Sequence, residues 1–308
     1  MDLDALPFGV IGFGRVGAAI AGALHGLGHP NAGVTARSDA GREHADAVLP
    51  GVAIRSPEEV ADRAGLVFLT VPDSQILPLA QQLAGHWRAG QILVHTSGAQ
   101  GLAALEPAAA AGALTLAIHP AMTFTGTSLD VGRMRGAHFG VEAPPGLAPL
   151  ADALVMSLGG TPFRLPSEVR PIYHAALSHA ANHLVTLIAQ ALDVLAWAGV
   201  DQPGEVLTPL VTEALGGALA NGMGALTGPA ARGDAATLGL HRTAWAEYAA
   251  AHGALVDPGV VLDQAAAVAL DAVNSYRALA RATIRQAAAR GMITAEQAAS
   301  GEAQVGGE

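Results

Sequence analysis

Six residues near the start of the chain form a glycine-rich motif that could bind a dinucleotide. They are Gly12, Phe13, Gly14, Arg15, Val16 and Gly17, spaced as Gly-x-Gly-x-x-Gly. An apolar run expected to be a strand precedes the motif, and an alanine-rich run with helical spacing follows it. In that context the first glycine permits a tight turn, the second lets the backbone approach a pyrophosphate, and the third lets helix and strand pack closely. We therefore expect dinucleotide binding rather than a glycine-rich packing turn.

The choice between NAD and NADP depends on a position about 20 residues beyond the glycines, at the end of the second strand. An Asp or Glu at that position accepts hydrogen bonds from the ribose hydroxyls of NAD. This chain has Arg37 and Ser38 there, which offer a guanidinium fork and a hydroxyl to a phosphate group. Asp39 is the alternative, either as a displaced ribose ligand or as the cap of the next helix. The pattern favours NADP as the cofactor.

Polar residues also follow three later strands, at the ends where open α/β sheets bind ligands. Val71 and Pro72 end one strand and are expected to contact the cofactor, whereas Asp73 is expected to cap the helix that follows. Ser97 ends the next strand and should present its hydroxyl to the same crevice, and His119 ends the strand after that. Three polar motifs at the same end of successive strands indicate one ligand-binding edge.

A long apolar helix expected in the second half of the chain carries two polar ridges. His174, Ser178 and Asn182 are four residues apart, so they share one helical face. His179 and His183 form a second ridge, turned by about 100° from the first. The alternative to a functional role is a polar network between packed helices. A metal site is not expected, because no carboxylate ligand is suitably spaced near these residues.

The residue types absent from the chain narrow the chemistry further. All sixteen basic residues are Arg, and there is neither Lys nor Cys. A lysine Schiff base, a lysine acid and a thiolate nucleophile are therefore excluded. A proton donor must be His, Tyr, a carboxylic acid or water. We rank His119 and His174 first as catalytic groups, because the pKa of histidine lies near neutrality, with Asn182 as the group that orients the substrate.

The order of apolar runs indicates the scaffold for these residues, an α/β N-terminal region of Rossmann type with a doubly wound parallel sheet and helices on both faces. Short apolar runs predict strands at residues 8–11, 33–36, 52–54, 66–71, 91–95, 113–118, 137–142 and 162–165. Alanine- and leucine-rich segments predict helices between them, for example at 16–27, 76–86 and 147–158.

From residue 171 onward the periodicity is helical throughout, which predicts an all-α C-terminal domain. We place the boundary near Ser167, giving an NADP-binding domain at 1–166 and a helical substrate and dimerisation domain at 167–308. Breaks between helices are expected at 199–204, 216–232 and 253–259, with one helix starting at Asp257-Pro258. Residues 301–308 are expected to form a frayed tail.

The composition excludes several classes of protein. The chain has 308 residues, of which 51% are hydrophobic and 14% charged, and this balance excludes a disordered chain. Its net charge of −10 argues against nucleic-acid binding. The uncharged run at 171–192 contains His174, His179, Asn182 and His183, which are costly in a membrane. Because the N-terminus also lacks the basic segment of a signal peptide, we expect a cytoplasmic protein without a membrane segment.

Six motifs together resemble those of one protein family. They are GFGRVG (12–17), VPDSQI (71–76), HTSGA (95–99), HPAMTF (119–124), YHAALSHAAN (173–182) and LTGPAARGD (226–234). From residue 8 to about residue 291, the chain resembles Rossmann-like proteins with a C-terminal domain of unknown function, family 2520. That group is similar in layout to the 6-phosphogluconate dehydrogenase-like superfamily, which includes pyrroline-5-carboxylate reductases and β-hydroxyacid dehydrogenases.

The resemblance implies an NADP-binding domain joined to an all-helical domain, with the substrate bound between them and commonly a homodimer formed through the helices. β-Hydroxyacid dehydrogenases and ketopantoate reductases use a Lys four residues before an Asn on the first long helix of the second domain. The position that matches this Lys is Ser178. Their lysine mechanism therefore does not carry over, although the orienting role of Asn182 can.

These observations predict an NADPH-dependent oxidoreductase that acts on a small carbonyl or imine compound. The nicotinamide would supply a hydride, and the protein would supply orientation and a proton. The alternative is a catalytically inactive NADP-binding or sensor protein, which the missing lysine keeps open.

Overall fold

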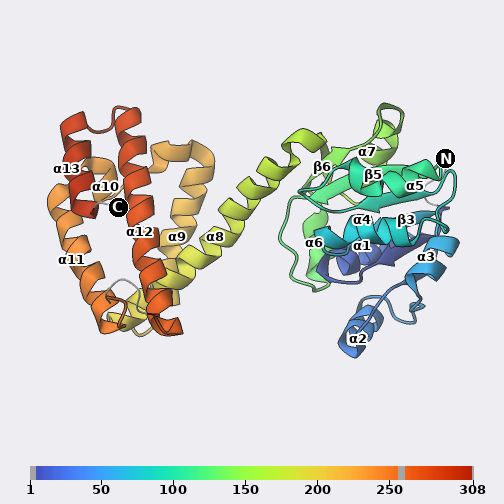
Figure 1. Ribbon diagram of the computed structural model, residues 1–308, viewed down its shortest axis with the longest axis horizontal. Helices are drawn as coiled ribbons and strands as arrows, with labels where there is room; N and C mark the ends of the chain where they lie inside the picture. The colour runs from blue at the N-terminus through green and yellow to red at the C-terminus, as the bar shows by residue number, and fades with distance from the viewer. Residues whose placement is uncertain (1–4, 256–260, 307–308) are drawn as a thin grey trace. The chain divides into compact units, whose positions relative to one another are not determined.

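The computed structural model describes residues 5–255 and 261–306. The chain divides into two compact units, Met1–Ala180 and Ala181–Glu308 (Figure 1). The division falls inside the long helix that starts near the boundary expected at Ser167, because the first turns of this helix contact the sheet of the first unit.

The first unit is built on a seven-stranded sheet. Its strands are β1 Phe8–Ile11, β2 Asn31–Val34, β3 Leu66–Leu69, β4 Ile92–His95, β5 Leu114–Pro120, β6 His138–Glu142 and β7 Thr161–Arg164. Their order in the sheet is β2-β1-β3-β4-β5-β6-β7. All neighbours are parallel except β5 and β6, which pair antiparallel. The carboxyl ends of β1 to β5 therefore lie along one edge of the sheet, which is where ligands bind in this class of fold.

Helices cover both faces of this sheet. They are α1 Arg15–Gly26, α2 Asp39–Val48, α3 Pro57–Arg63, α4 Asp73–Gln82, α5 Glu106–Ala110, α6 Leu129–Met134 and α7 Ala148–Ser157. Alternate residues of each strand enter two separate cores: Val10 and Phe68 pack with α1 and α7, whereas Ile11 and Val67 pack with α3 and α4. This alternation confirms the expected doubly wound sheet.

Three details of the sheet differ from the sequence-based expectation. The run at 52–54 is not a strand but forms a single bridge between Ile54 and Val34, since the chain touches the sheet edge there for only one pair. β2 begins and ends two residues earlier than expected, so Thr35 and Ala36 belong to the loop beyond it. The sheet is also not wholly parallel, because β6 returns antiparallel beside β5.

The helix α8 Arg170–Trp197 begins in the first unit and ends in the second. The second unit adds α9 Pro203–Asn221, α10 Pro229–Arg232, α11 Ala235–Ala251, α12 Gln264–Ala289 and α13 Ala295–Val305. No strand occurs among its described residues, as expected. The expected helix start at Asp257-Pro258 lies outside the described residues, and α12 begins after Asp263, whose side chain accepts a hydrogen bond from the amide of Ala266.

Two expectations for the second unit are wrong. The break expected from residue 216 onward begins at Gly222, because α9 continues through Gly216 and Gly217. Residues 301–305 are not a frayed tail but part of α13, and Gly301 is buried with Ile284 beside it. A Cβ at position 301 would lie 3.2 Å from the Ile284 side chain, so glycine permits the close packing of α13 on α12.

Among the described residues, Ser167–Trp197 is one helical segment long and apolar enough to cross a membrane by length and composition alone, with a mean hydropathy of 1.2. Near its start lies Arg170, which is fully buried in the first unit and paired with Glu142. A charged group anchored inside a folded unit is not the end of a membrane span, so this segment is weak evidence for one.

Candidate functional site

The glycine-rich turn between β1 and α1 has the geometry that a dinucleotide requires. Gly12 adopts a positive φ of 101°, and a Cβ there would lie 2.8 Å from the carbonyl oxygen of Thr70. A Cβ on Gly17 would lie 2.5 Å from the carbonyl oxygen of Gly12, whereas one on Gly14 would meet no atom within 4 Å. The first and third glycines are therefore needed for packing, and the second leaves open space above the backbone.

Two threonines from neighbouring strands hold this turn. The amide of Gly12 donates to the Thr35 hydroxyl at 2.8 Å, and the Thr70 hydroxyl donates to the Gly12 carbonyl at 2.6 Å. No side chain caps α1 at Gly14, so the amides of its first turn remain available to an anion. A helix N-terminus of this kind binds pyrophosphate through its amides and its dipole, and the turn thus fits the predicted cofactor.

A cavity of about 470 Å³ extends from this turn along the carboxyl ends of β1, β2 and β3. Its lining includes Gly12, Phe13, Gly14, Thr35, Ala36, Arg37, Ser38, Gly41, Arg55, Val71, Pro72 and Gln75. Most of the residues predicted to contact the cofactor are thus brought together. The exceptions in the glycine motif are Arg15, Val16 and Gly17, which lie in the first turn of α1 and do not line the cavity.

The far end of the cavity carries positive charge. Arg37 is exposed, and Ser38 begins α2, where its hydroxyl oxygen accepts a hydrogen bond from the amide of Gly41 at 3.1 Å. Ser38 is therefore the cap of this helix, and Asp39 is its first residue. The Ser38 hydroxyl keeps its own proton and can still donate it to a phosphate oxygen.

Arg55 is a second cation at this end of the cavity that the sequence did not indicate. Its amide donates to the Val34 carbonyl at 3.0 Å, which places it beside the carboxyl end of β2. Its Nε donates to the Ala32 carbonyl at 2.9 Å, and its guanidinium lies 3.8 Å from Glu59. The apolar run at 52–54 could have indicated Arg55, because this run returns to the sheet edge and Arg55 follows it directly.

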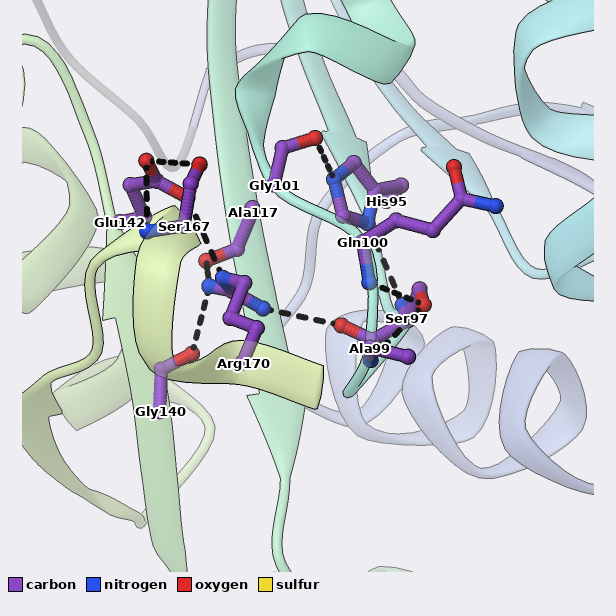
Figure 2. A network of polar contacts seen from close by, with 10 residues as sticks. All are labelled: His95, Ser97, Ala99, Gln100, Gly101, Ala117, Gly140, Glu142, Ser167 and Arg170. Atoms are coloured by element: carbon purple, nitrogen blue, oxygen red, sulfur yellow. Dashed lines mark hydrogen bonds and ion pairs between the residues drawn. The ribbon is translucent and has the colours of Figure 1, made fainter. Parts of the chain in front are cut away.

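A buried network joins the ends of β3 and β4. The Ser97 hydroxyl donates to the Asp73 carboxylate at 2.7 Å. It also accepts from the amides of Ala99 and Gln100 (Figure 2). The expectation that Asp73 caps α4 is therefore wrong, since its carboxylate binds Ser97 and no side chain caps that helix. Ser97 is 4% exposed and lies outside the cavity lining, so it shapes the loop after β4.

Arg170 ties the start of α8 to the same strand ends. Its guanidinium donates to the Glu142 carboxylate at 3.1 Å and to the carbonyl oxygens of Ser97 at 3.0 Å and Ala117 at 2.9 Å (Figure 2). Burial lowers the pKa of Arg170, and the charge of Glu142 opposes that shift. A fully buried guanidinium with this many partners fixes the first turn of α8 against β4, β5 and β6.

His95 is a buried, neutral member of this network. Its Nδ1 accepts from the Ser97 amide at 3.2 Å, so its Nε2 carries the proton and donates to the Gly101 carbonyl at 3.1 Å (Figure 2). Burial, together with the charge of Arg170, lowers the pKa of His95 to about 4. Because both of its ring nitrogens are engaged by the backbone, His95 supports the loop after β4.

Next to this network, His119, Tyr173 and His174 form a cluster of rings at the carboxyl ends of β4 and β5. Nδ1 of His119 lies 3.0 Å from the Tyr173 hydroxyl, and the rings of His119 and His174 meet edge to face at 6.0 Å. A Cβ on Gly98 would lie 2.7 Å from His174 and 2.9 Å from Nε2 of His119. The two predicted histidines are thus close together, and Tyr173 is an additional member that the sequence reasoning did not single out.

The sequence predicted a catalytic histidine with a pKa near neutrality, but the pKa of His119 in the structure is lower. Burial lowers its pKa to about 4, with further lowering from His174 and Arg170 and a small opposing effect from Asp73. At neutral pH this imidazole is therefore uncharged, with one N–H and one lone pair. The third residue proposed as catalytic, Asn182, lies further along α8, in the second unit.

Two family profiles match successive parts of the chain. Residues 2–120 match a Rossmann-like domain, and residues 137–283 match the domain of unknown function DUF2520. No curated protein sequence matches the chain.

Several solved structures share the fold over nearly the full length. A Bacteroides fragilis protein assigned as an NADP oxidoreductase, BF3122, is 22% identical with a TM-score of 0.72, over 92% of this chain and 99% of that chain. The Streptomyces aurantiacus imine reductase is 19% identical with a TM-score of 0.57, over 94% and 100% of the two chains. Pyrroline carboxylate reductase from Plasmodium falciparum, with NADP bound, is 12% identical with a TM-score of 0.53, over 97% and 99%. At these identities the similarity shows the fold, which is one that oxidoreductases with nicotinamide dinucleotides share.

Proposed function

Because this chain joins a Rossmann-like domain to a DUF2520 domain, we propose that it is an NADPH-dependent oxidoreductase that reduces a small carbonyl or imine compound. The observation that carries this proposal is the Gly12–Gly17 turn, with its open backbone at Gly14 and the cavity that runs from it to Arg37. When bound there, NADPH supplies the hydride that such a reduction needs.

The protein's own residues supply binding and orientation. The uncapped first turn of α1 holds the pyrophosphate, and Arg37, Ser38 and Arg55 bind the 2′-phosphate of NADPH. The His119 and His174 rings lie further along the same edge of the sheet, where the nicotinamide end of a dinucleotide is directed in this class of fold. A bound substrate meets the uncharged His119 imidazole there, which suits an uncharged carbonyl or imine.

We also propose that the protein acts as a homodimer in the cytoplasm. α9 contains no buried residue, and Leu210 and Leu219 on it are 65% and 81% exposed. An apolar helix left uncovered in this way is typical of a surface that a second copy covers. Dimerisation through the second unit would bury this face.

The test of the proposed activity is NADPH oxidation by the purified protein with a panel of cyclic imines, small oxo acids and aldehydes. We expect turnover with at least one compound, and His174→Ala should lower it while leaving the NADPH dissociation constant unchanged. Gly14→Asp tests whether the turnover depends on binding of the dinucleotide at the glycine-rich turn. The backbone at Gly14 is extended and its Cβ direction is open, so the variant should fold normally yet place a carboxylate against the pyrophosphate.

The outcomes separate the proposed enzyme from the alternative. Turnover that Gly14→Asp abolishes supports the enzyme. Tight NADPH binding without turnover of any compound in the panel favours a binding or sensor protein. Failure to bind NADPH at all overturns both.

A further inference from the structure

We propose that Tyr173 is the residue that delivers a proton to the substrate and that His119 supplies Tyr173 with a replacement proton. This inference rests on the proposed reductase function and names the proton path within the same site. It is carried by the contact between the two side chains, by the way Arg170 fixes Tyr173, and by the environment of the outer edge of His119.

The contact brings together residues that are 54 positions apart in the sequence. Nδ1 of His119, near the end of β5, lies 3.0 Å from the hydroxyl of Tyr173, and the two rings are nearly perpendicular with centroids 5.5 Å apart. Phe163 contacts Tyr173 with a ring separation of 5.9 Å. Both His119 and Tyr173 remain partly exposed, so a substrate can reach the hydroxyl.

The position of Tyr173 is set by the buried anchor of α8. Arg170 lies three residues before Tyr173, and its guanidinium binds Glu142 and carbonyl oxygens of β5 and the loop after β4. The buried ion pair therefore holds the backbone at Tyr173 against the strand ends, and the contact with His119 orients the tyrosine side chain. A proton donor needs this kind of fixed position, because it must lie within hydrogen-bond reach of the atom it protonates.

Tyr173 and His119 are both uncharged at neutral pH, so each can pass on one proton and receive another. Burial raises the pKa of Tyr173, although Arg170 opposes the shift, so the phenol keeps its proton at neutral pH. His119 is neutral and has one proton to give. If that proton is on Nδ1, it points at the tyrosine oxygen and leaves the tyrosine O–H free for a substrate.

The outer edge of the His119 ring faces Gly98. A Cβ at that position would lie 2.9 Å from Nε2, closer than side chains pack. A larger residue at position 98 would therefore crowd Nε2, the ring nitrogen that the proposed path requires to take up a proton. The neighbouring Asp73 is engaged by Ser97, and the chain has no Lys or Cys to compete for the role.

The proposed step is balanced. Hydride from a reduced nicotinamide dinucleotide forms a C–H bond at the carbon of a C=N or C=O group, and the π electrons move to nitrogen or oxygen. That atom takes the proton of the Tyr173 hydroxyl. The tyrosine oxygen takes the Nδ1 proton of His119, and Nε2 takes a hydrated proton from the solvent, so that one hydride and one solvent proton are consumed in each turnover. Return of the imidazole to the Nδ1–H tautomer restores the site.

The second unit offers a matched control for this pair. There, Nδ1 of His241 lies 2.7 Å from the Tyr276 hydroxyl, with ring centroids 5.9 Å apart. Tyr173→Phe and Tyr276→Phe thus remove the same kind of hydrogen bond from different places. With a cyclic imine that the wild-type protein reduces, Tyr173→Phe should lower kcat by about 100-fold or more, and Tyr276→Phe should leave it unchanged. The NADPH dissociation constant should be unaffected by either change.

His119 acts through Tyr173, so its variants need a finer test. In His119→Asn the amide N–H can replace Nδ1–H, so this variant should retain about tenfold more activity than His119→Ala. A second measurement needs no substrate. Nitrogen NMR of the NADPH-loaded protein should show His119 in the Nδ1–H form, and Tyr173→Phe should shift that Nδ1 resonance while Tyr276→Phe does not.

Each outcome bears on the inference. If the wild-type protein reduces an imine and Tyr173→Phe reduces it equally well, Tyr173 is not the donor. An Nε2–H tautomer of His119, with the tyrosine donating to Nδ1, also overturns the path. If the wild-type protein reduces no compound in the panel, the proposed function itself fails, and the inference that rests on it fails with it.

Discussion

The two units of this chain bury their groups in very different ways. In the first unit, strand residues such as Val10 and Phe68 are almost wholly inaccessible, and even the charged Arg170 is 0% exposed and fully hydrogen-bonded. In the second unit, α9 has no buried residue at all, and Leu219 on it is 81% exposed. The first unit completes its own core and, on our proposal, holds the catalytic groups. The second carries apolar surface that, on our proposal, a second copy covers.

The largest effect should come from breaking the buried ion pair of the first unit. Arg170→Met removes the cationic partner of Glu142 and one donor to each of the carbonyl oxygens of Ser97, Ala117 and Gly140, which should cost about 3–5 kcal/mol of unfolding free energy. The matched control is Arg285→Met in the second unit, where the pair with Glu302 is 71% and 38% exposed and should contribute less than about 1 kcal/mol. Hydrogen exchange of the slowest amides in each unit measures both changes. Equal losses from the two variants would contradict the difference between the units.

The second-largest effect should be the change in stability of the first unit with pH. The pKa of His95 is about 4 in the folded protein and 6.5 when exposed, so the unfolded chain binds more protons between these values. Stability should therefore fall as the pH decreases through this window, with about 3 kcal/mol arising from His95. In a variant with Trp197 and Trp245 replaced by Phe, Trp87 reports denaturant unfolding of this unit alone.

His95→Gln provides the control for that dependence. The glutamine amide can still donate to the Gly101 carbonyl but does not titrate. The variant should lose less stability than the parent between pH 6.5 and pH 4, values set by the two pKa limits of His95. The same slope in both proteins would show that His95 is not held neutral.

In the second unit, the largest effect on dimerisation should come from substitutions on the exposed face of α9. Leu219→Glu on α9 places a charge on the surface that we propose a second copy covers, and it should weaken dimerisation by about 100-fold, or about 2.7 kcal/mol. Leu129→Glu is the control, since Leu129 is 65% exposed but lies in the first unit. Light scattering across a dilution series gives the dimer fraction. A wild-type mass of 30.8 kDa at every concentration would contradict the dimer.

The parts of the site that could be predicted from the sequence depend on neighbours along the chain. The Gly12–Gly17 turn is a strand, a loop and a helix in succession, so spacing alone defined it. Tyr173 and Arg55 could not be found in this way, because pairings between distant segments place them. Tyr173 meets a histidine 54 residues earlier, and Arg55 reaches the cavity through a single bridge to β2. Periodicity also cannot show that burial makes His119 a neutral group, because that depends on the packed fold.

The smallest effect should be the difference in affinity between NADPH and NADH. Only substitutions in the first unit should change it. Arg37 and Ser38 line the cavity where we propose that the ribose 2′-phosphate binds, so NADPH should bind about tenfold tighter than NADH or better, which is about 1.4 kcal/mol. Arg37→Ala should remove most of that difference, because its guanidinium makes a charge-assisted contact only with the 2′-phosphate. Arg55→Gln should lower NADPH affinity by a smaller factor, since this side chain also holds the Ala32 carbonyl. Arg42→Ala on α2 and Arg232→Ala in the second unit should change neither affinity, because neither arginine lines the cavity. Calorimetry with both cofactors decides the matter: equal affinities in the unmodified protein would remove the case for NADP, while the glycine turn would still support binding of a dinucleotide.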